Sequence, residues 1–287
     1  MKPIALDAMG GDHAPQEIVL GAVAAAREGR AVALVGRAEA VVPHLKATGY
    51  RGDLISLIDA PEVGESHEPP LKAIRSKPQS SIAVGVGLVK DGAAAAFVSA
   101  GSTGAVVATA LLLLGKMEGV DRPALGILYG TRNGTALLLD VGANADCRPE
   151  FLAQFAHLGN LYMERVLGRA RPRIGLLNNG EEEGKGNQLT RNSYALLKES
   201  PLNFVGNVEA KDIFLGVADV VVTDGFTGNM VLKANEGFGE NLFWHLSNTL
   251  QSGLHLRLLG LLLRPTLGTF KRKVDYSEYG GAPLLGV

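Results

Sequence analysis

The sequence predicts an α/β protein built around a mainly parallel sheet, on three observations. Short apolar runs of strand length alternate with longer stretches rich in Ala, Leu, Glu and Lys, which is the pattern of consecutive βα units. Of the 287 residues, 46% are hydrophobic and 20% are charged, enough to build one large core or two lobes. No repeat or low-complexity linker divides the chain. We therefore expect one compact α/β domain over residues 1–287, single or bilobed.

The expected elements follow in order along the chain. Apolar runs that end in polar or glycine-containing turns predict strands at 4–6, 31–35, 54–58, 94–99, 124–128, 135–140, 174–177, 203–207 and 220–223. The first helix is expected to begin beside Pro15, because proline favours a first helical turn. Helical length and composition predict helices at 16–27, 37–46, 70–75, 80–90, 104–114, 149–167, 187–199, 210–215 and 229–246.

Composition excludes several classes of protein. The net charge of −1 provides no overall basic field, so nucleic acid is not an expected partner. Cys147 is the only cysteine, which excludes an intrachain disulfide and a thiolate metal site. No signal peptide is visible at the N-terminus. The most apolar runs, 105–114 and 254–263, are shorter than the roughly 18 residues that span a bilayer. We therefore expect a cytoplasmic protein.

The turn at residues 7–15 follows the first expected strand and is the first candidate site. Its glycine pair, Gly10 and Gly11, lets backbone N–H groups approach an anion. Asp12 and His13 add a charge and a proton carrier beside it. Ligands of open α/β sheets bind at the carboxyl ends of strands, which is where this turn lies. The alternative is a simple strand-to-helix turn in which Asp12 caps the helix.

Two further strand ends carry similar polar turns. After the strand at 94–99, the chain enters a helix through Ser102, Thr103 and Gly104, whose N–H and hydroxyl groups can form an anion cradle. The alternative is an ordinary Ser or Thr helix cap. After the strand at 135–140 comes a turn containing Asp140 and Asn144, which can either bind a ligand or only shape the turn.

The loop at residues 178–186 places Asn179 and three glutamates ahead of Lys185, which lies between two glycines. A charge run is usually a solvated loop, but an ammonium without bulky neighbours can also reach a phosphate or an oxyanion. The loop does not have the spacing of a Walker phosphate-binding motif.

The turn that follows the strand at 220–223 contains Asp224, Thr227 and Asn229, and Lys233 and Glu236 share a face of the following helix. On a structural interpretation, Asp224 caps the helix and Lys233 is solvated. On a functional one, backbone N–H groups around Thr227 hold an anion and Lys233 points toward it.

Missing motifs narrow the chemistry. The sequence has no G-x-S-x-G elbow, and Cys147 lies outside these turns, so a Ser or Cys acyl-enzyme is unsupported. The glycines at 85–87 and 237–239 lack the third glycine of a dinucleotide fingerprint. The six histidines form no ligand pair at helical spacing. No cofactor and no metal are expected.

These turns together, above all the run from Ala218 to Asn229, resemble the bacterial phosphate acyltransferase (PlsX) family in order and spacing over nearly the whole chain. The resemblance implies a three-layer α/β/α Rossmann-like sandwich, related to the phosphotransacetylase and isocitrate/isopropylmalate dehydrogenase folds. It implies formation of acyl phosphate from acyl-acyl carrier protein and inorganic phosphate, for phosphatidic acid and phospholipid synthesis. It also implies a homodimer at the membrane surface. Family members usually continue past the turn at 280–286, so this chain is expected to be truncated relative to them.

The resemblance lets each turn be given a role. Gly10, Gly11, Ser102, Thr103 and Gly104 are expected to hold phosphate, with Lys185 or Lys233 neutralising charge. His13 is expected to move a proton or to hold the phosphate, oriented by Asp12 or Asp224. The candidates for contacts with carbonyl or phosphate are Asn144, Asn179, Thr227 and Asn229.

The leucine-rich segment at about 245–273 is expected to form a helical hairpin. It either buries itself or a dimer interface, or it presents an apolar surface around Leu254 to Leu263 to the membrane. The acidic carrier protein requires positive charge, for which the candidates are 165–173, with its four arginines, and Arg264 with Lys271 to Lys273. Two alternatives remain: a phosphotransacetylase-like enzyme that uses acyl-CoA, and a non-catalytic membrane scaffold.

Overall fold

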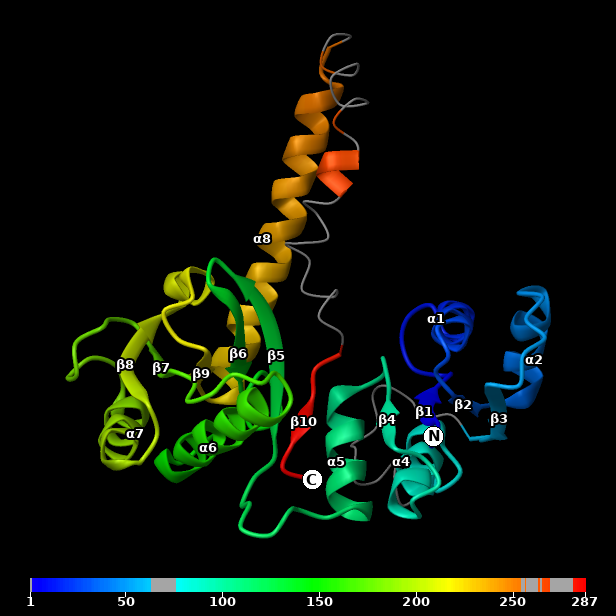
Figure 1. The fold of residues 1–287 in the computed structure, drawn as a ribbon, viewed down its shortest axis with the longest axis horizontal. Coiled ribbons are helices and arrows are strands. Elements are labelled where there is room, and N and C mark those ends of the chain that lie inside the picture. The colour runs from blue at the N-terminus through cyan, green and yellow to red at the C-terminus, as the bar shows by residue number, and fades with distance from the viewer. Residues whose placement is uncertain (1, 63–75, 254–255, 257–262, 264, 269–280) are drawn as a thin grey trace. The chain divides into compact units, whose positions relative to one another are not determined.

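The computed structural model describes residues 2–62, 76–253, 256, 263, 265–268 and 281–287. The chain divides into two compact units, the first comprising Met1–Met117 with Val287 and the second comprising Glu118–Gly286. Each unit has its own sheet (Figure 1). The polar turns that the sequence singles out are therefore divided between two sheets, whereas the sequence predicted a single one. An alternation of strands and helices looks the same in either case, because sheet membership depends on long-range pairing.

The first unit is a four-stranded parallel sheet with strand order β3-β2-β1-β4. Its elements are β1 (Ile4–Asp7), α1 (Gln16–Arg27), β2 (Val32–Gly36), α2 (Ala38–Ala47), β3 (Ile55–Asp59), α4 (Ser81–Lys90), β4 (Ala96–Val98) and α5 (Thr103–Leu113). Successive strand residues face opposite sides. Leu34 packs in a core with α1 and α2, while Val35 packs in a second core with α4. This unit is therefore a three-layer α/β/α sandwich.

The second unit holds a six-stranded sheet of order β10-β5-β6-β9-β7-β8. Its elements are β5 (Ala124–Thr131), β6 (Gly134–Leu139), α6 (Pro149–Arg165), β7 (Ile174–Asn178), α7 (Gln188–Glu199), β8 (Phe204–Glu209), the 3₁₀ helix η1 (Ala210–Leu215), β9 (Val220–Val222), α8 (Gly225–Gln251) and β10 (Leu284–Leu285). β6, β9, β7 and β8 run parallel, while β5 is antiparallel to both of its neighbours. Figure 1 shows α6 and α7 on one face of the sheet and α8 on the other. Helices α6 and α7 share one hydrophobic core, and α8 packs against a second.

Every strand predicted from the sequence is present, with ends shifted by a few residues. The sequence missed β10, which has only two residues. Helix α8 begins at Gly225, earlier than the predicted 229, and residues 210–215 form a 3₁₀ helix. The predicted helix at 70–75 lies outside the described residues, as does about half of the predicted hairpin at 245–273, including most of its leucine-rich part at 254–263. Among the described helices, none combines the length and apolarity needed to cross a bilayer.

Candidate active-site turns

In the first unit, the turns after β1 and β4 are joined through a buried carboxylate. Asp7 is 1% exposed; its Oδ1 accepts the Met9 N–H at 3.0 Å, and its Oδ2 accepts the Ser99 hydroxyl at 2.6 Å. Ser99 Oγ in turn accepts the Gly101 N–H at 3.0 Å. Because β1 and β4 are neighbouring parallel strands, both turns lie at one edge of the sheet. The carboxylate therefore fixes two of the predicted anion-binding turns relative to each other.

The backbones of these two turns are in contact at Gly10 and Gly101. A Cβ on Gly10 would lie 2.6 Å from Asp7 Oδ2 and 2.7 Å from the Gly101 nitrogen, so no larger residue fits. Gly11 has a φ of +98°, a conformation that L side chains rarely adopt. The structure thus brings Gly10 and Gly11 beside the start of α5, where Ser102, Thr103 and Gly104 are exposed.

The alternatives proposed for these turns have different outcomes. Asp12 does not cap α1: the cap position is Pro15, and no side chain bonds to the helix end. Asp12 and His13 are exposed, and neither side chain makes a hydrogen bond or an ion pair with any described residue. Ser102, in contrast, does cap α5, since its Oγ accepts the Ala105 N–H at 3.4 Å. His13 thus remains accessible to a ligand.

In the second unit, the turn after β6 is organised by Asp140. This carboxylate is fully buried and accepts the N–H groups of Leu125, Gly142, Ala143 and Asn144 at 2.7–3.2 Å. It also accepts Asn144 Nδ2 at 2.9 Å, and that amide donates to the Pro123 carbonyl at 2.7 Å. Both Nδ2 hydrogens of Asn144 are therefore used to shape the turn, which leaves only its Oδ1 for a ligand.

The start of α8 packs directly on the turn formed by Asp140 to Asn144. A Cβ on Gly228 would lie 1.9 Å from the Asp140 carbonyl oxygen, and one on Gly225 would lie 2.6 Å from that of Asn144. Asp224 caps the helix: its Oδ1 accepts the Thr227 N–H at 2.8 Å and its Oδ2 accepts the Thr227 hydroxyl at 2.8 Å. The capping interpretation of Asp224 is confirmed, and Asn229 is exposed one helical turn further along.

Both candidate lysines have acidic neighbours. Lys185 Nζ lies 3.8 Å from Glu182, and both side chains are largely exposed. Lys233 Nζ lies 2.7 Å from Glu236 Oε2, which confirms that the two share a face of α8. Asn179 is exposed in the same loop as Lys185.

Tyr129 lies near Glu236. Burial raises the pKa of Tyr129, the side chain of Asn235 partly offsets this, and the negative charge of Glu236 adds to the increase.

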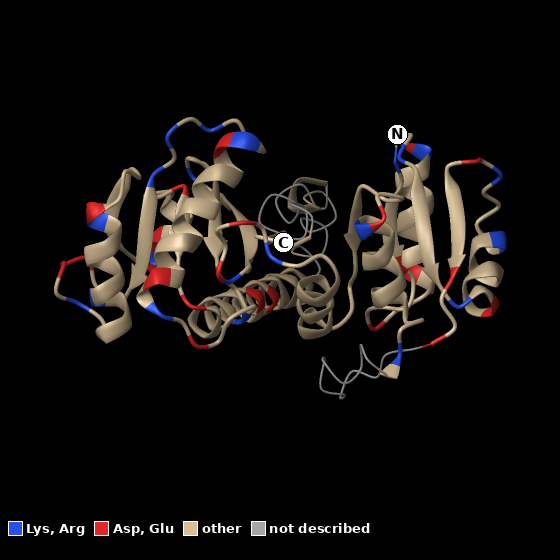
Figure 2. Ribbon diagram, turned by 90° about the horizontal axis from the view of Figure 1, so that it is seen from below, with Lys and Arg blue, Asp and Glu red and all other residues tan. Residues whose placement is uncertain are grey.

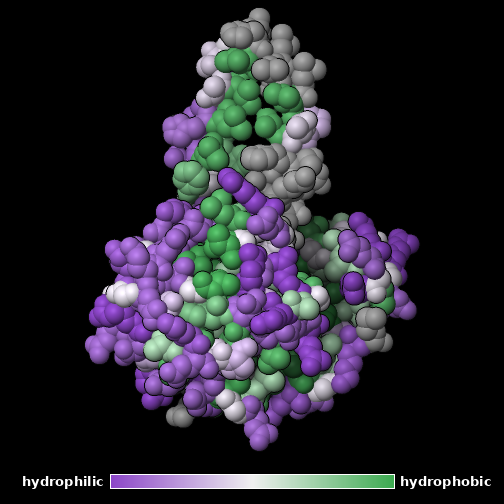
Figure 3. Space-filling view, turned by 60° about the vertical axis from the view of Figure 1, so that its left-hand side comes forward, coloured by the Kyte–Doolittle hydropathy of each residue, from purple (hydrophilic) through white to green (hydrophobic). Residues whose placement is uncertain are grey.

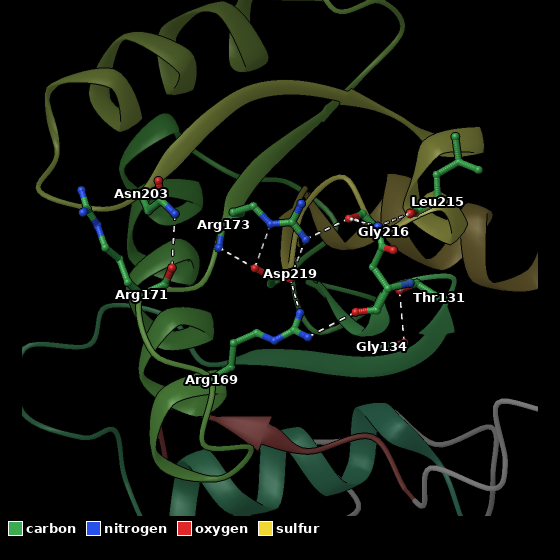
Figure 4. Close-up of polar contacts among 10 residues, drawn as sticks. Thr131, Gly134, Arg169, Arg171, Arg173, Asn203, Leu215, Gly216 and Asp219 are labelled. Carbon is green, nitrogen blue, oxygen red and sulfur yellow. Dashed lines mark hydrogen bonds and ion pairs between the residues drawn. The ribbon is translucent and has the colours of Figure 1, made fainter.

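The predicted basic patch at 165–173 is only partly a free surface (Figure 4). Arg169 and Arg173 both bind the buried Asp219. Arg173 donates to Asp219 through its backbone N–H at 2.8 Å and through its guanidinium at 2.9 and 3.1 Å. Burial alone would raise the pKa of Asp219, but the hydrogen bonds and charges of the arginines outweigh it and lower that pKa. Asp219 thus offsets one of the two positive charges of Arg169 and Arg173, whose side chains remain 34% and 37% exposed, and a role of this patch in binding a partner stays a prediction.

Two further findings limit the chemistry. Burial raises the pKa of Cys147 to about 12, and Asp140, Asp224 and Asp146 add to this, while a backbone hydrogen bond at Gly225 opposes it. The thiol is therefore protonated at neutral pH and is a poor nucleophile. Among the described residues, no group of three or more His, Cys, Asp and Glu side chains could hold a metal ion.

Figure 2 shows acidic and basic residues interspersed over each unit, in keeping with the net charge of −1.

Comparison with solved structures identifies the class of fold. A phosphotransacetylase from Streptococcus pyogenes matches with a TM-score of 0.63, at 18% identity, over 83% of this chain and 82% of that one. A branched-chain phosphotransacylase from Enterococcus faecalis matches with a TM-score of 0.61, at 16% identity, over 83% and 85% of the two chains. The chain therefore has the α/β/α fold of the phosphotransacetylases, as the sequence predicted.

Sequence comparison then identifies the family. The family model described as "Fatty acid synthesis protein" matches residues 2–287. The phosphate acyltransferase of Desulforamulus reducens is 51% identical over 296 residues, which cover 100% of this chain and 86% of that protein. The phosphate acyltransferase of Aquifex aeolicus is 46% identical over 100% of this chain and 85% of that protein. The chain belongs to this family of phosphate acyltransferases, and the resemblance inferred from its turns is confirmed.

Proposed function

We propose that this chain moves a fatty acyl group from acyl carrier protein to inorganic phosphate and releases an acyl phosphate for phosphatidic acid synthesis. The observation that supports this most is the contact between the Gly10 and Gly101 turns of the first unit. It places the buried Gly10 and the exposed Gly11 beside the exposed N-terminus of α5, where unpaired N–H groups and the helix dipole favour an anion. Inorganic phosphate is the substrate of matching size and charge.

The proposed chemistry needs no nucleophile from the protein. A phosphate oxygen attacks the thioester carbonyl carbon, a C–O bond forms, the C–S bond breaks, and the carrier thiolate leaves and takes up a proton. The protein must position the two substrates and stabilise the tetrahedral oxyanion. Gly10, Gly11, Ser102, Thr103 and Gly104 hold phosphate, and Lys185 and Lys233 neutralise developing charge. Asn144, Asn179, Thr227 and Asn229 contact the carbonyl or the phosphate.

His13 is the proposed proton carrier of the first unit. Its exposed imidazole either holds the phosphate or protonates the leaving thiolate, and Asp12 is placed beside it in the turn. Asp224 is the weaker candidate for orienting His13, because both of its oxygens already accept from Thr227.

The direct test incubates the protein with palmitoyl-acyl carrier protein and phosphate, and traps the acyl phosphate with hydroxylamine. His13→Ala, Lys185→Ala and Lys233→Ala are each expected to lower the rate by about tenfold or more. Matched controls are His157→Ala and Lys46→Ala; both residues are exposed and neither belongs to the proposed site. If all three site variants stay within about threefold of wild type, the assigned residues are wrong.

The donor needs its own test, since the same chemistry would serve a phosphotransacetylase-like enzyme. Palmitoyl-CoA and palmitoyl-acyl carrier protein are compared at equal concentrations, and we expect the carrier protein to be preferred. A preference for the CoA thioester would favour the alternative. Binding of either donor without any trapped acyl phosphate would favour a non-catalytic scaffold.

We also propose that the protein forms a homodimer at the membrane surface. Helix α8 extends beyond its sheet, with only Gly225 and Gly228 buried, and carries exposed Phe238 (69%), Leu242 (47%) and Trp244 (60%) (Figure 3). Large apolar side chains gathered on one helix usually mark an interaction surface. The basic residues proposed to assist at the membrane, Arg257, Arg264 and Lys271 to Lys273, lie outside the described residues.

Dimer and membrane binding are tested separately. Phe238→Glu with Leu242→Glu should lower the mass measured by light scattering, whereas Asn241→Glu, an exposed control on the same helix, should not. Leu258→Glu with Leu262→Glu should abolish flotation with anionic liposomes and leave activity on soluble substrate intact. Unchanged flotation would exclude the assigned membrane segment.

A further inference from the structure

The loop that carries Lys185 is closed at a single carbonyl group. The Glu182 carbonyl oxygen accepts the Lys185 N–H at 3.0 Å and also accepts Asn207 Nδ2 at 2.8 Å. The second bond comes from β8, 25 residues away in the chain. The side-chain amide of Asn207, on β8, therefore fixes the turn that contains Lys185.

Asn207 is an unusual residue for its position. It lies near the carboxyl end of β8 and is 7% exposed, and its Oδ1 is buried without a hydrogen-bond partner in the described part of the chain. Burying a half-satisfied amide opposes folding, and an apolar side chain of similar size would avoid this cost. The presence of a costly amide at this position therefore calls for an explanation, and its bond to the Glu182 carbonyl is the one interaction that an apolar side chain could not make.

The opposite side of Lys185 is held as well. Asn178 Nδ2 donates to the Lys185 carbonyl at 3.2 Å, and Asn178 Oδ1 accepts the Asn179 N–H at 2.9 Å. Gly186 follows with a φ of +88°, and a Cβ there would lie 2.4 Å from Asn178 Oδ1. Both peptide groups of Lys185 are thus fixed, while its side chain remains 51% exposed.

The charges of the loop leave the ammonium of Lys185 available to an anion. Glu183 is engaged by Lys198 through both of its oxygens, at 2.9 and 3.0 Å. Of the other two glutamates of the loop, Glu182 is the one that pairs with Lys185: it lies 3.8 Å from Lys185 Nζ, and its side chain is 71% exposed. Such an exposed, long pair contributes little and gives way readily to a negatively charged ligand.

We propose that Asn207 is a positioning residue that sets the place of Lys185 for acyl transfer. Its amide donates to the Glu182 carbonyl, which also accepts the Lys185 N–H. The backbone of Lys185, from which its ammonium extends, is therefore held in place relative to the sheet. The inference rests on the proposed function, since it assumes that Lys185 acts on the substrates. Asn207 itself need not touch them.

The test uses the full chain with Asn207→Leu, which removes the donor at similar volume, and Asn207→Asp, which replaces the donor with an oxygen. The control is Asn203→Leu, because Asn203 Nδ2 likewise donates to a carbonyl, that of Arg171, at 3.2 Å. Both Asn207 variants should lower kcat/KM for acyl phosphate formation about tenfold, and the control should stay within about threefold. Circular dichroism and thermal melting verify that each variant is folded.

A double-mutant cycle separates positioning from general damage. In a Lys185→Ala background, Asn207→Leu should have no further effect on the rate, because the group that it positions is gone. Amide hydrogen exchange at Lys185, which needs no activity, should speed up in Asn207→Leu and not in Asn203→Leu. An equal loss of rate in both backgrounds, or unchanged exchange at Lys185, overturns the inference. A wild type that forms no acyl phosphate refutes the proposed function, and the inference with it; an active wild type without coupling refutes the inference alone.

Discussion

Ser99 Oγ donates to Asp7 Oδ2 at 2.6 Å, across 92 positions of the chain. The bond joins the ends of β1 and β4 and is the polar link between the two glycine turns of the first unit. Because Asp7 is 1% exposed, its second oxygen has no access to water as a substitute partner. The geometry of the proposed phosphate-binding turns therefore depends on Ser99, which precedes α5 and is not one of the residues proposed to hold phosphate.

Ser99→Ala is predicted to destabilise the first unit. The change leaves a buried carboxylate oxygen unsatisfied, which costs about 1–3 kcal/mol in free energy of unfolding. Hydrogen exchange of the β1 and β4 amides measures this unit by itself. The control is Ser102→Ala, which removes an exposed helix cap whose hydrogen bond is 3.4 Å long and should cost about 1 kcal/mol or less. Equal losses for the two variants would contradict the role given to Asp7 and Ser99.

The ion-paired Asp219 is predicted to make the stability of the second unit depend on acid pH. Its pKa is lowered in the folded state, so near and below the ordinary carboxyl pKa of about 3.9 the unfolded chain binds more protons than the folded one. Stability therefore rises with pH through this range, is fully present above about pH 5, and is lost as the pH falls toward the lower pKa.

Asp219→Asn should flatten this acid-side dependence and lower stability at neutral pH, because two arginines lose their partner. Chemical denaturation between pH 2.5 and 7, about the range over which a carboxylate titrates, measures both effects. Glu240→Gln, an exposed carboxyl on α8 without an ion pair to any described residue, is the control. A wild-type slope that survives in Asp219→Asn would assign the dependence to other groups.

Cys147 is predicted to be an inert thiol. With a pKa of about 12, its thiolate fraction at pH 8 is on the order of a thousandfold below that of an ordinary cysteine, so alkylation should be slower by about that factor. The same protein in denaturant should react at the ordinary rate, and Cys147→Ala should retain acyl transfer. Rapid labelling of the folded protein, with loss of activity, would reopen a cysteine mechanism.

The strands could be predicted because buried parallel strands appear in the sequence as apolar runs that stop at polar turns, as at Val220–Val222. The division into two sheets could not, since pairing between distant strands leaves no local pattern. The same limit applies to side-chain partners. Arg173 appeared as part of a basic patch because nothing nearby in sequence signals that Asp219 binds it.

The turns were predicted as sites, but the residues that support them were not. Ser99 was seen only as a strand end, and Asn207 lay inside a predicted strand; both act through partners far away in the chain. A polar residue near the carboxyl end of an apolar strand was the one available signal for Asn207. Asp224 was correctly seen as a possible cap, because its partner Thr227 is three residues away.

Gly228 is predicted to be the residue on which the attachment of α8 depends. A Cβ there would lie 1.9 Å from the Asp140 carbonyl oxygen and 3.0 Å from its carbon, and these are backbone atoms that the carboxylate of Asp140 holds in place through the N–H groups around it. Gly228→Ala must therefore displace either the helix or the turn. Overpacking of this kind costs about 1–3 kcal/mol or more in free energy of unfolding, and activity should fall with it.

The same helix provides the matched controls for this variant. A Cβ on Gly237 or Gly239 would meet no described atom within 4 Å beyond its own stretch of helix, so alanine at either should stabilise α8 by roughly 0.5–1 kcal/mol through helix propensity. Denaturant unfolding and hydrogen exchange at the first turns of α8 distinguish the outcomes. Opposite signs for Gly228→Ala and Gly237→Ala would establish that close approach, and not helix propensity, requires Gly228. Stabilisation by both would mean that α8 does not rest on the Asp140 turn.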